Sequence, residues 1–244
     1  MHNYKLVIEY DGTDFFGWQR QKQTKKTVQE TIERSLKKVT GEDITLIAAG
    51  RTDTGVHALN QTANFKTSKK LDTKKLVYSL NSVLPDSITV KKAVKVKDDF
   101  HARYSAKKKE YIYQVSCGKK SVEGDYFYKL NYELDFKAID ELAEFFRGEH
   151  SFKPLCKNKT DKHDFRCNIT KLDYKRRNRN KEIIFRIEAN RFLHSMIRAL
   201  VGCLIDAGRG KADVKTIKQK FPKGEKIKTT YLPAKGLILN KIYY

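Results

Sequence analysis

Cysteine is scarce in this sequence, and its spacing is irregular. The four cysteines among 244 residues form no C-x-x-C pair. This pattern is typical of reduced thiols in a cytosolic protein rather than of a disulfide framework or a zinc site. Cys156, His163 and Cys167 offer only three candidate ligands in a lysine-rich segment. We therefore predict a cytoplasmic protein that binds no metal.

Long apolar runs are also absent. The mean hydropathy is −0.66, and no stretch is long enough to span a bilayer. A first strand is expected at residues 4–10, which leaves no room for a signal peptide. The sequence thus predicts no membrane segment.

Acidic residues are few compared with basic ones. Lys and Arg number 51 and Asp and Glu number 29, so the net charge is +22 and the pI is near 9.7. Such a balance indicates a polyanionic partner, either nucleic acid or an acidic membrane face. The sequence contains no P-loop, no G-x-S-x-G motif and no dinucleotide fingerprint.

The order of predicted elements indicates an α+β fold. In the first half it is strand, helix, strand, strand, helix, strand, which is the order of a ferredoxin-like or RNA-recognition-motif lobe. The ranges are 4–10, 27–41, 44–49, 61–67, 73–84 and 88–96. The second half has a similar order, with strands expected at 110–116, 168–174, 182–188 and 237–242 and helices at 135–147 and from Asn190. We predict two tandem lobes, residues 1–104 and 105–244.

Residues 50–58 read GRTDTGVHA and follow an apolar, β-prone run. Gly50 and Gly55 permit a tight turn that presents Asp53 at its tip. A carboxylate in such a turn either caps backbone amides or serves as a catalytic group beside a cation. The spacing alone leaves both alternatives open.

The helix expected from Asn190 is apolar around most of its circumference. Arg198 shares the remaining narrow sector with His194, Ser195 and Gly202. An isolated buried charge is costly, so Arg198 is expected to pair with an acid or to face a cleft. On these residues alone, a structural ion pair and a functional role are equal alternatives.

Further segments accompany GRTDTGVHA in a fixed order, and together they cover the chain almost from end to end. They are YDGTDFFGWQRQ (10–21), NSVLPDS (81–87), FHARYSAKKK (100–109), NRFLHSMIR (190–198) and PAKGLILNKIYY (233–244). With these motifs the sequence resembles the tRNA pseudouridine synthase A family.

The resemblance implies a cofactor-free enzyme that converts uridine to pseudouridine at positions 38, 39 and 40 in the anticodon arm of tRNA. It implies that Asp53 is the nucleophile and that Arg198 acts with it. It also implies that Arg51 helps to splay the target nucleotide, that Tyr111 stacks on the base, and that Leu237 lines the pocket. The expected fold is two lobes that share an antiparallel sheet, with the active-site cleft between them. The expected assembly is a homodimer that binds one tRNA.

Two groups of basic residues are candidates for binding RNA phosphates. Arg176, Arg177 and Arg179 lie in a predicted hairpin tip, and Arg103 and Lys109 lie near Tyr111. Such runs are usually only solvated. Two rival functions also stay open: a pseudouridine synthase that acts on ribosomal RNA, and a non-catalytic RNA-binding protein. The sequence leaves undecided whether Asp53 attacks C6, attacks C1′ or acts through a glycal.

Overall fold

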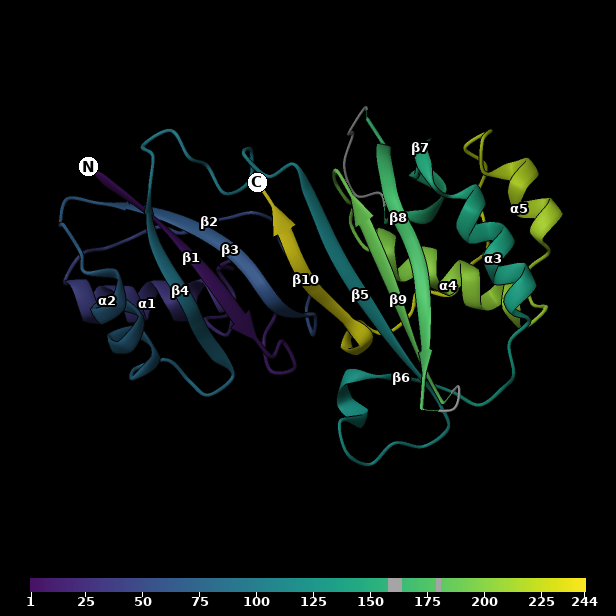
Figure 1. The fold of residues 1–244 in the computed structure, drawn as a ribbon, viewed down its shortest axis with the longest axis horizontal. Coiled ribbons are helices and arrows are strands. Elements are labelled where there is room, and N and C mark those ends of the chain that lie inside the picture. The colour runs from purple at the N-terminus through teal and green to yellow at the C-terminus, as the bar shows by residue number, and fades with distance from the viewer. Residues whose placement is uncertain (158–163, 179–180) are drawn as a thin grey trace. The chain divides into compact units, whose positions relative to one another are not determined.

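The chain folds into two compact units in a computed structural model that describes residues 1–157, 164–178 and 181–244 (Figure 1). The first unit contains Met1–Lys107 together with Ile238–Tyr244, and the second contains Lys108–Leu237. The last residues belong to the first unit because the closing strand pairs with a strand of that unit.

The first unit is a sheet with two helices. Its central strand, β1 (His2–Tyr10), pairs antiparallel with β3 (His57–Thr67) on one side and with β4 (Ile88–Val96) on the other. The short strand β2 (Ile47–Ala48) pairs antiparallel with the second half of β3. The closing strand β10 (Leu237–Tyr243) pairs in parallel with the first two residues of β3. The helices are α1 (Val28–Thr40) and α2 (Thr73–Asn81).

Local signals account for helix α1. The Thr27 side chain accepts a hydrogen bond from the Glu30 amide at 3.3 Å, and Gly41 ends the helix with a φ of +74°. Val28, Ile32 and Leu36 are fully buried, so the helix packs through the apolar stripe that its sequence predicts.

The second unit is built on four strands paired antiparallel in the order β5-β9-β8-β7, with β6 parallel to β5. Phe146, Phe152, Phe185 and Phe221 are buried within it. The strands are β5 (Lys108–Cys117), β6 (Tyr128–Leu130), β7 (Gly148–Ser151), β8 (Arg166–Arg177) and β9 (Glu182–Ala189). The helices are α3 (Phe136–Phe145), α4 (Met196–Gly208) and α5 (Val214–Lys220), with short 3₁₀ turns at Gly124–Tyr126, Lys153–Leu155 and Ala234–Gly236.

The predicted α+β class is confirmed, but two details of the prediction are wrong. The expectation of purely antiparallel pairing fails because β3–β10 and β5–β6 are parallel. The helix predicted from Asn190 begins only at Met196, because Ser195 has a φ of +57° and residues 190–195 are not helical. Across the described ranges, no helix has the length and apolar character needed to cross a membrane.

Candidate active site

Asp53 lies on a tight turn between β2 and β3 in the first unit. The Val56 amide donates to the Asp53 carbonyl at 3.1 Å, and Gly55 has a φ of +74°. The Asp53 side chain is half-buried, whereas the preceding Arg51 is exposed. The turn therefore presents one carboxylate and one exposed guanidinium two residues apart.

A second loop, residues 11–18, packs against this turn. The Trp18 amide donates to the Thr52 carbonyl at 3.1 Å. Two glycines make the close approach possible. A Cβ atom on Gly12 would lie 2.1 Å from the Val56 carbonyl oxygen, and one on Gly17 would lie 2.7 Å from the Thr52 carbonyl oxygen. Any side chain at either position would push the two loops apart.

Thr52 anchors the turn to the core of the first unit. Its hydroxyl lies 2.8 Å from the Tyr10 hydroxyl, and both residues are buried. Burial raises the pKa of Tyr10 to about 12, although hydrogen bonds from Thr52 and Gln61 oppose the rise. Gln61 also donates to the Gly50 carbonyl at 2.8 Å. A neutral tyrosine and a buried amide thus fix the residues that precede Asp53.

His57 follows the turn and is 3% exposed. The Gly12 amide and Asp11 Oδ1 both lie 3.0 Å from its Nδ1 atom. The Gly12 N–H donates to this nitrogen, and Asp11 Oδ1 also accepts from the Thr13 amide and hydroxyl. His57 therefore links the turn to the supporting loop through one ring nitrogen.

Arg198 lies on α4 in the second unit, facing a segment that we call the strap (Thr229–Gly236). Its Nε atom donates to the Leu232 carbonyl at 2.6 Å, and the Leu232 amide donates back to the Arg198 carbonyl at 3.3 Å. The side chain is half-buried. The strap thus fixes one edge of the guanidinium through a backbone carbonyl.

Two further residues on the same helical stripe secure the strap. Gly202 lets it approach so closely that a Cβ atom there would lie 1.8 Å from the Thr230 carbonyl oxygen. Asp206, which is 2% exposed, accepts from the Thr230 amide at 2.8 Å and lies 3.1 Å from Arg209 Nη2. Asp206 is not among the residues predicted from the sequence, although its spacing of eight residues from Arg198 places both on one face of a helix.

The two tyrosines of β5 differ in their surroundings. Tyr113 is fully buried and donates to the Pro233 carbonyl of the strap at 2.7 Å. Burial raises its pKa well above the usual range, and the charge of Arg198 opposes the rise. Tyr111 is 6% exposed, and its ring meets Phe192 edge to face at 5.2 Å. Tyr113 therefore packs in the core, while the role expected for Tyr111 stays a prediction.

The remaining predicted residues lie at several places in the chain. Leu237 is buried at the start of β10. Arg103, Arg176 and Arg177 are exposed, and Lys109 is half-buried at the start of β5. Arg179 and His163 lie outside the described residues. Within the described ranges, no group of three or more His, Cys, Asp or Glu side chains could hold a metal ion.

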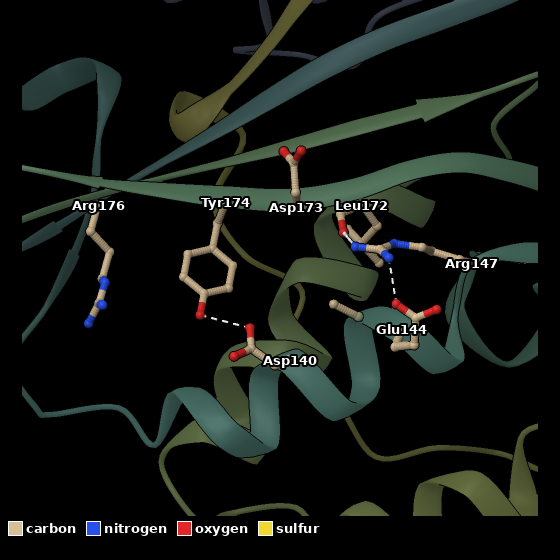
Figure 2. A pocket seen from close by; sticks show the side chains of 8 residues that line it. Asp140, Glu144, Arg147, Leu172, Asp173, Tyr174 and Arg176 are labelled. Carbon is tan, nitrogen blue, oxygen red and sulfur yellow. Dashed lines mark hydrogen bonds and ion pairs between the residues drawn. The ribbon is translucent and has the colours of Figure 1, made fainter.

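A pocket of about 440 Å³ lies between α3 and β8 in the second unit. Figure 2 shows Tyr174 and Arg176 pointing from β8 toward α3. The Tyr174 hydroxyl donates to Asp140 at 2.8 Å, and Arg147 contacts both Glu144 and the Leu172 carbonyl. Arg176 lies 4.6 Å from the centre of the Phe136 ring. Because these polar groups already have partners, and Arg176 alone of the predicted residues lines the pocket, we assign no chemistry to it.

An RNA-modifying isomerase is the class of protein that the sequence motifs around Asp53 and Arg198 predict. Residues 6–105 and 142–244 match the family described as tRNA pseudouridine synthase, and the chain belongs to this family. Proteins named tRNA pseudouridine synthase A from Caldicellulosiruptor saccharolyticus and Caldicellulosiruptor bescii are 42% and 44% identical to it, with full coverage of both chains in each case. The solved structure titled "Crystal Structure of a Cbf5-Nop10-Gar1 Complex" matches with a TM-score of 0.41 and 12% identity over 97% of this chain and 48% of that one. No inference rests on so distant a likeness.

Proposed function

We propose that this protein isomerises uridine to pseudouridine in tRNA and that Asp53 is the nucleophile. One observation carries the assignment. The Asp53 turn, inside the segment that matches the family, is fixed on both sides by the close approach of Gly12 and Gly17 and by the buried Tyr10–Thr52 contact. Fixed geometry at a carboxylate is what a covalent or charge-stabilising step requires.

The reaction breaks the C1′–N1 bond, turns the base and forms a C1′–C5 bond. It consumes no co-reactant, because the C5 proton is released and N1 acquires one from solvent. The target nucleotide has to leave its stack before a side chain can reach it. We assign the splaying of that nucleotide to the exposed Arg51, base stacking to Tyr111, contact with the bound uridine to Leu237, and stabilisation of charge to Arg198.

We further propose that the enzyme modifies uridines 38, 39 and 40 of the anticodon arm. We also propose that it forms a homodimer and is located in the cytoplasm. The strand order β4-β1-β3-β2 of the first unit supports the ferredoxin-like lobe, and the predicted lobes remain residues 1–104 and 105–244. Arg103, Lys109, Arg176 and Arg177 are proposed contacts to RNA phosphates.

The substitution Asp53→Asn tests the proposal. Pseudouridine formation is measured as tritium released from C5 of labelled uridine in a tRNA transcript. We expect turnover to fall on the order of 10³-fold or more, the scale for a lost nucleophile. The Kd for tRNA is expected to stay nearly constant, because phosphate contacts supply most of the affinity.

Asp14→Asn is the matched control, because Asp14 is an exposed carboxylate in the supporting loop. It should leave turnover unchanged. Residual activity near wild type in Asp53→Asn would refute the nucleophile assignment. If the wild-type protein modifies ribosomal RNA transcripts but not tRNA, the assignment of tRNA as the substrate is wrong.

A further inference from the structure

An exposed aromatic cluster lies on the loop that follows β4 in the first unit. Tyr104 is 76% exposed. The His101 ring lies 4.3 Å from the Tyr104 ring between centroids, and the Arg103 guanidinium lies 5.6 Å from the centre of the Tyr104 ring. We call these three residues the aromatic platform. A large exposed ring flanked by a second ring and a cation is a surface on which a planar group can stack.

Hydrogen bonds within the turn fix the backbone that carries the platform. The Ser105 amide donates to the His101 carbonyl at 2.9 Å. The amides of Arg103 and Tyr104 lie 3.2 Å and 3.3 Å from His101 Nδ1 and donate to it. His101 therefore serves both as a stacking ring and as the acceptor that closes the turn.

Buried side chains anchor the same turn to the sheet. The Ala102 amide donates to Asn64 Oδ1 at 2.8 Å, and Asn3 Nδ2 donates to the Phe100 carbonyl at 2.9 Å. Asn3 and Asn64 are 0% and 1% exposed and also bond to each other at 3.0 Å. Tyr244 donates to the Ala102 carbonyl at 2.9 Å. Burying two side-chain amides is costly unless they form hydrogen bonds. Here they bond to each other and to the backbone of this loop, and these bonds hold the loop in place.

The residues of the turn divide by exposure. Ala102 is fully buried among the anchors, while Arg103 and Tyr104 face solvent. An adjoining pocket of about 430 Å³ is lined by Lys95, Lys97 and Ser105, and also by Asp99. The loop thus presents an exposed aromatic surface beside a hollow that carries two lysines and one aspartate.

We propose that the aromatic platform stacks on an unpaired nucleobase of the bound RNA, while Lys95 and Lys97 face its phosphates. Aromatic rings and guanidinium planes are the surfaces on which proteins stack unpaired bases. This contact uses none of the residues proposed for catalysis. The choice of RNA as the partner rests on the proposed function.

The test compares Tyr104→Ala, Tyr104→Trp and Tyr78→Ala in binding to an unmodified tRNA transcript over a range of salt concentrations. Tyr78 lies on α2 and is 79% exposed, so it controls for the loss of any exposed tyrosine. We expect Tyr104→Ala to raise Kd roughly tenfold, within the range measured for the loss of one base–aromatic stack. Tyr104→Trp should bind like wild type, and Tyr78→Ala should not change Kd.

The salt dependence separates stacking from charge. Tyr104→Ala should keep the slope of log Kd against log salt, because stacking releases no counterions. An unchanged Kd in Tyr104→Ala, or a change of equal size in Tyr78→Ala, would overturn the platform. So would a shift of oligomeric state in Tyr104→Ala measured by light scattering, since Tyr104 would then contact a second copy of the chain. The proposed function fails separately, if wild type binds tRNA through Tyr104 but forms no pseudouridine.

Discussion

Gly17 contacts the backbone on which the proposed nucleophile depends. Its φ is +81°, and a Cβ atom there would lie 2.7 Å from the Thr52 carbonyl oxygen and 3.2 Å from the Asp53 carbonyl carbon. Two separate physical costs therefore oppose a side chain at this position. One is the positive φ, and the other is the steric contact with the Asp53 turn.

The substitution Gly17→Ala should reduce both stability and turnover. We expect the free energy of unfolding to fall by about 2–5 kcal/mol, the sum of about 1–2 kcal/mol for the backbone conformation and about 1–3 kcal/mol for crowding. Turnover should fall roughly tenfold to a hundredfold, because Asp53 moves with Thr52. Denaturant unfolding and the tritium-release assay measure the two effects.

Gly118→Ala is the control for backbone conformation alone. Gly118 also has a positive φ, of +105°, but a Cβ atom there would have nothing within 4 Å. This variant should lose stability and keep its turnover. If Gly17→Ala behaves in the same way, the contact between the loops does not position Asp53.

Some residues of the site could be predicted from the sequence, and others could not. Asp53 stands out because GRTDTGVHA resembles a family motif, and Arg198 because it is a charge on an otherwise apolar helix; the roles of both stay predictions. The contacts of Gly12 and Gly17 could not be predicted, since they depend on which loop meets the turn. A lone Asp on an apolar helix, as Asp206 is, was a signal available in the sequence.

At the scale of elements, the best predictions are those in which local signals and packing agree. Helix α1 has its cap, its stripe and its terminal glycine within one segment. Helix α4 shows the opposite case. Asn190 Oδ1 accepts from the amides of Asn168 and Arg191, and the His194 carbonyl accepts from the Lys157 amide. The bonds to Asn168 and Lys157, which are distant in sequence, override a continuous helical periodicity, so the helix begins at Met196.

The strap and helix α4 form one device that positions Arg198. The Leu232 carbonyl orients the guanidinium, and Asp206 holds the strap through Thr230. Arg209 and Lys211 lie 3.1 Å and 3.6 Å from the Asp206 carboxylate and balance its charge. Removing the charge of Asp206 should therefore loosen the strap and change the orientation of the Arg198 side chain.

Asp206→Asn tests this coupling. The free energy of unfolding should fall by about 3 kcal/mol, the lower end for a broken buried pair, because both cationic partners reach solvent. That corresponds to a Tm lower by about 10 °C. We also expect kcat to fall while KM for tRNA stays constant, since the strap contacts the proposed active-site arginine and is not itself proposed to bind tRNA. Calorimetry and steady-state kinetics measure the two.

The control is Asp213→Asn, which removes an exposed carboxylate that caps α5. It should leave both the Tm and kcat nearly unchanged, because Asn caps a helix about as well as Asp does. If Asp206→Asn lowers Tm but keeps kcat in the protein that remains folded, Asp206 stabilises the unit without positioning Arg198.

At the scale of the whole molecule, the chain returns to its first unit at its end. Strand β10 pairs in parallel with His57 and Ala58, which directly follow the Asp53 turn. This pairing could not be predicted from local sequence patterns, because the two strands lie far apart in the sequence. The Lys107 amide donates to the Tyr243 carbonyl at 2.8 Å, and the Tyr244 ring lies 5.0 Å from the Phe100 ring. The last seven residues therefore brace both the turn and the loop that bears the aromatic platform.

A chain that ends at Leu237 should lose this bracing. We expect a lower Tm, new proteolytic cleavage within residues 98–107, and a rise in Kd for tRNA at least as large as that of Tyr104→Ala, because Ala102 and Phe100 lose their contacts with Tyr244.

Tyr244→Phe is the graded comparison. It removes one hydrogen bond worth about 1 kcal/mol and keeps the ring, so its Tm should fall by only about 2–4 °C. Limited proteolysis followed by mass spectrometry locates the cleavage. If the truncated chain keeps its Tm and resists cleavage in this loop, the closing strand does not hold it, and the rigidity of the platform has to come from Asn3 and Asn64 alone.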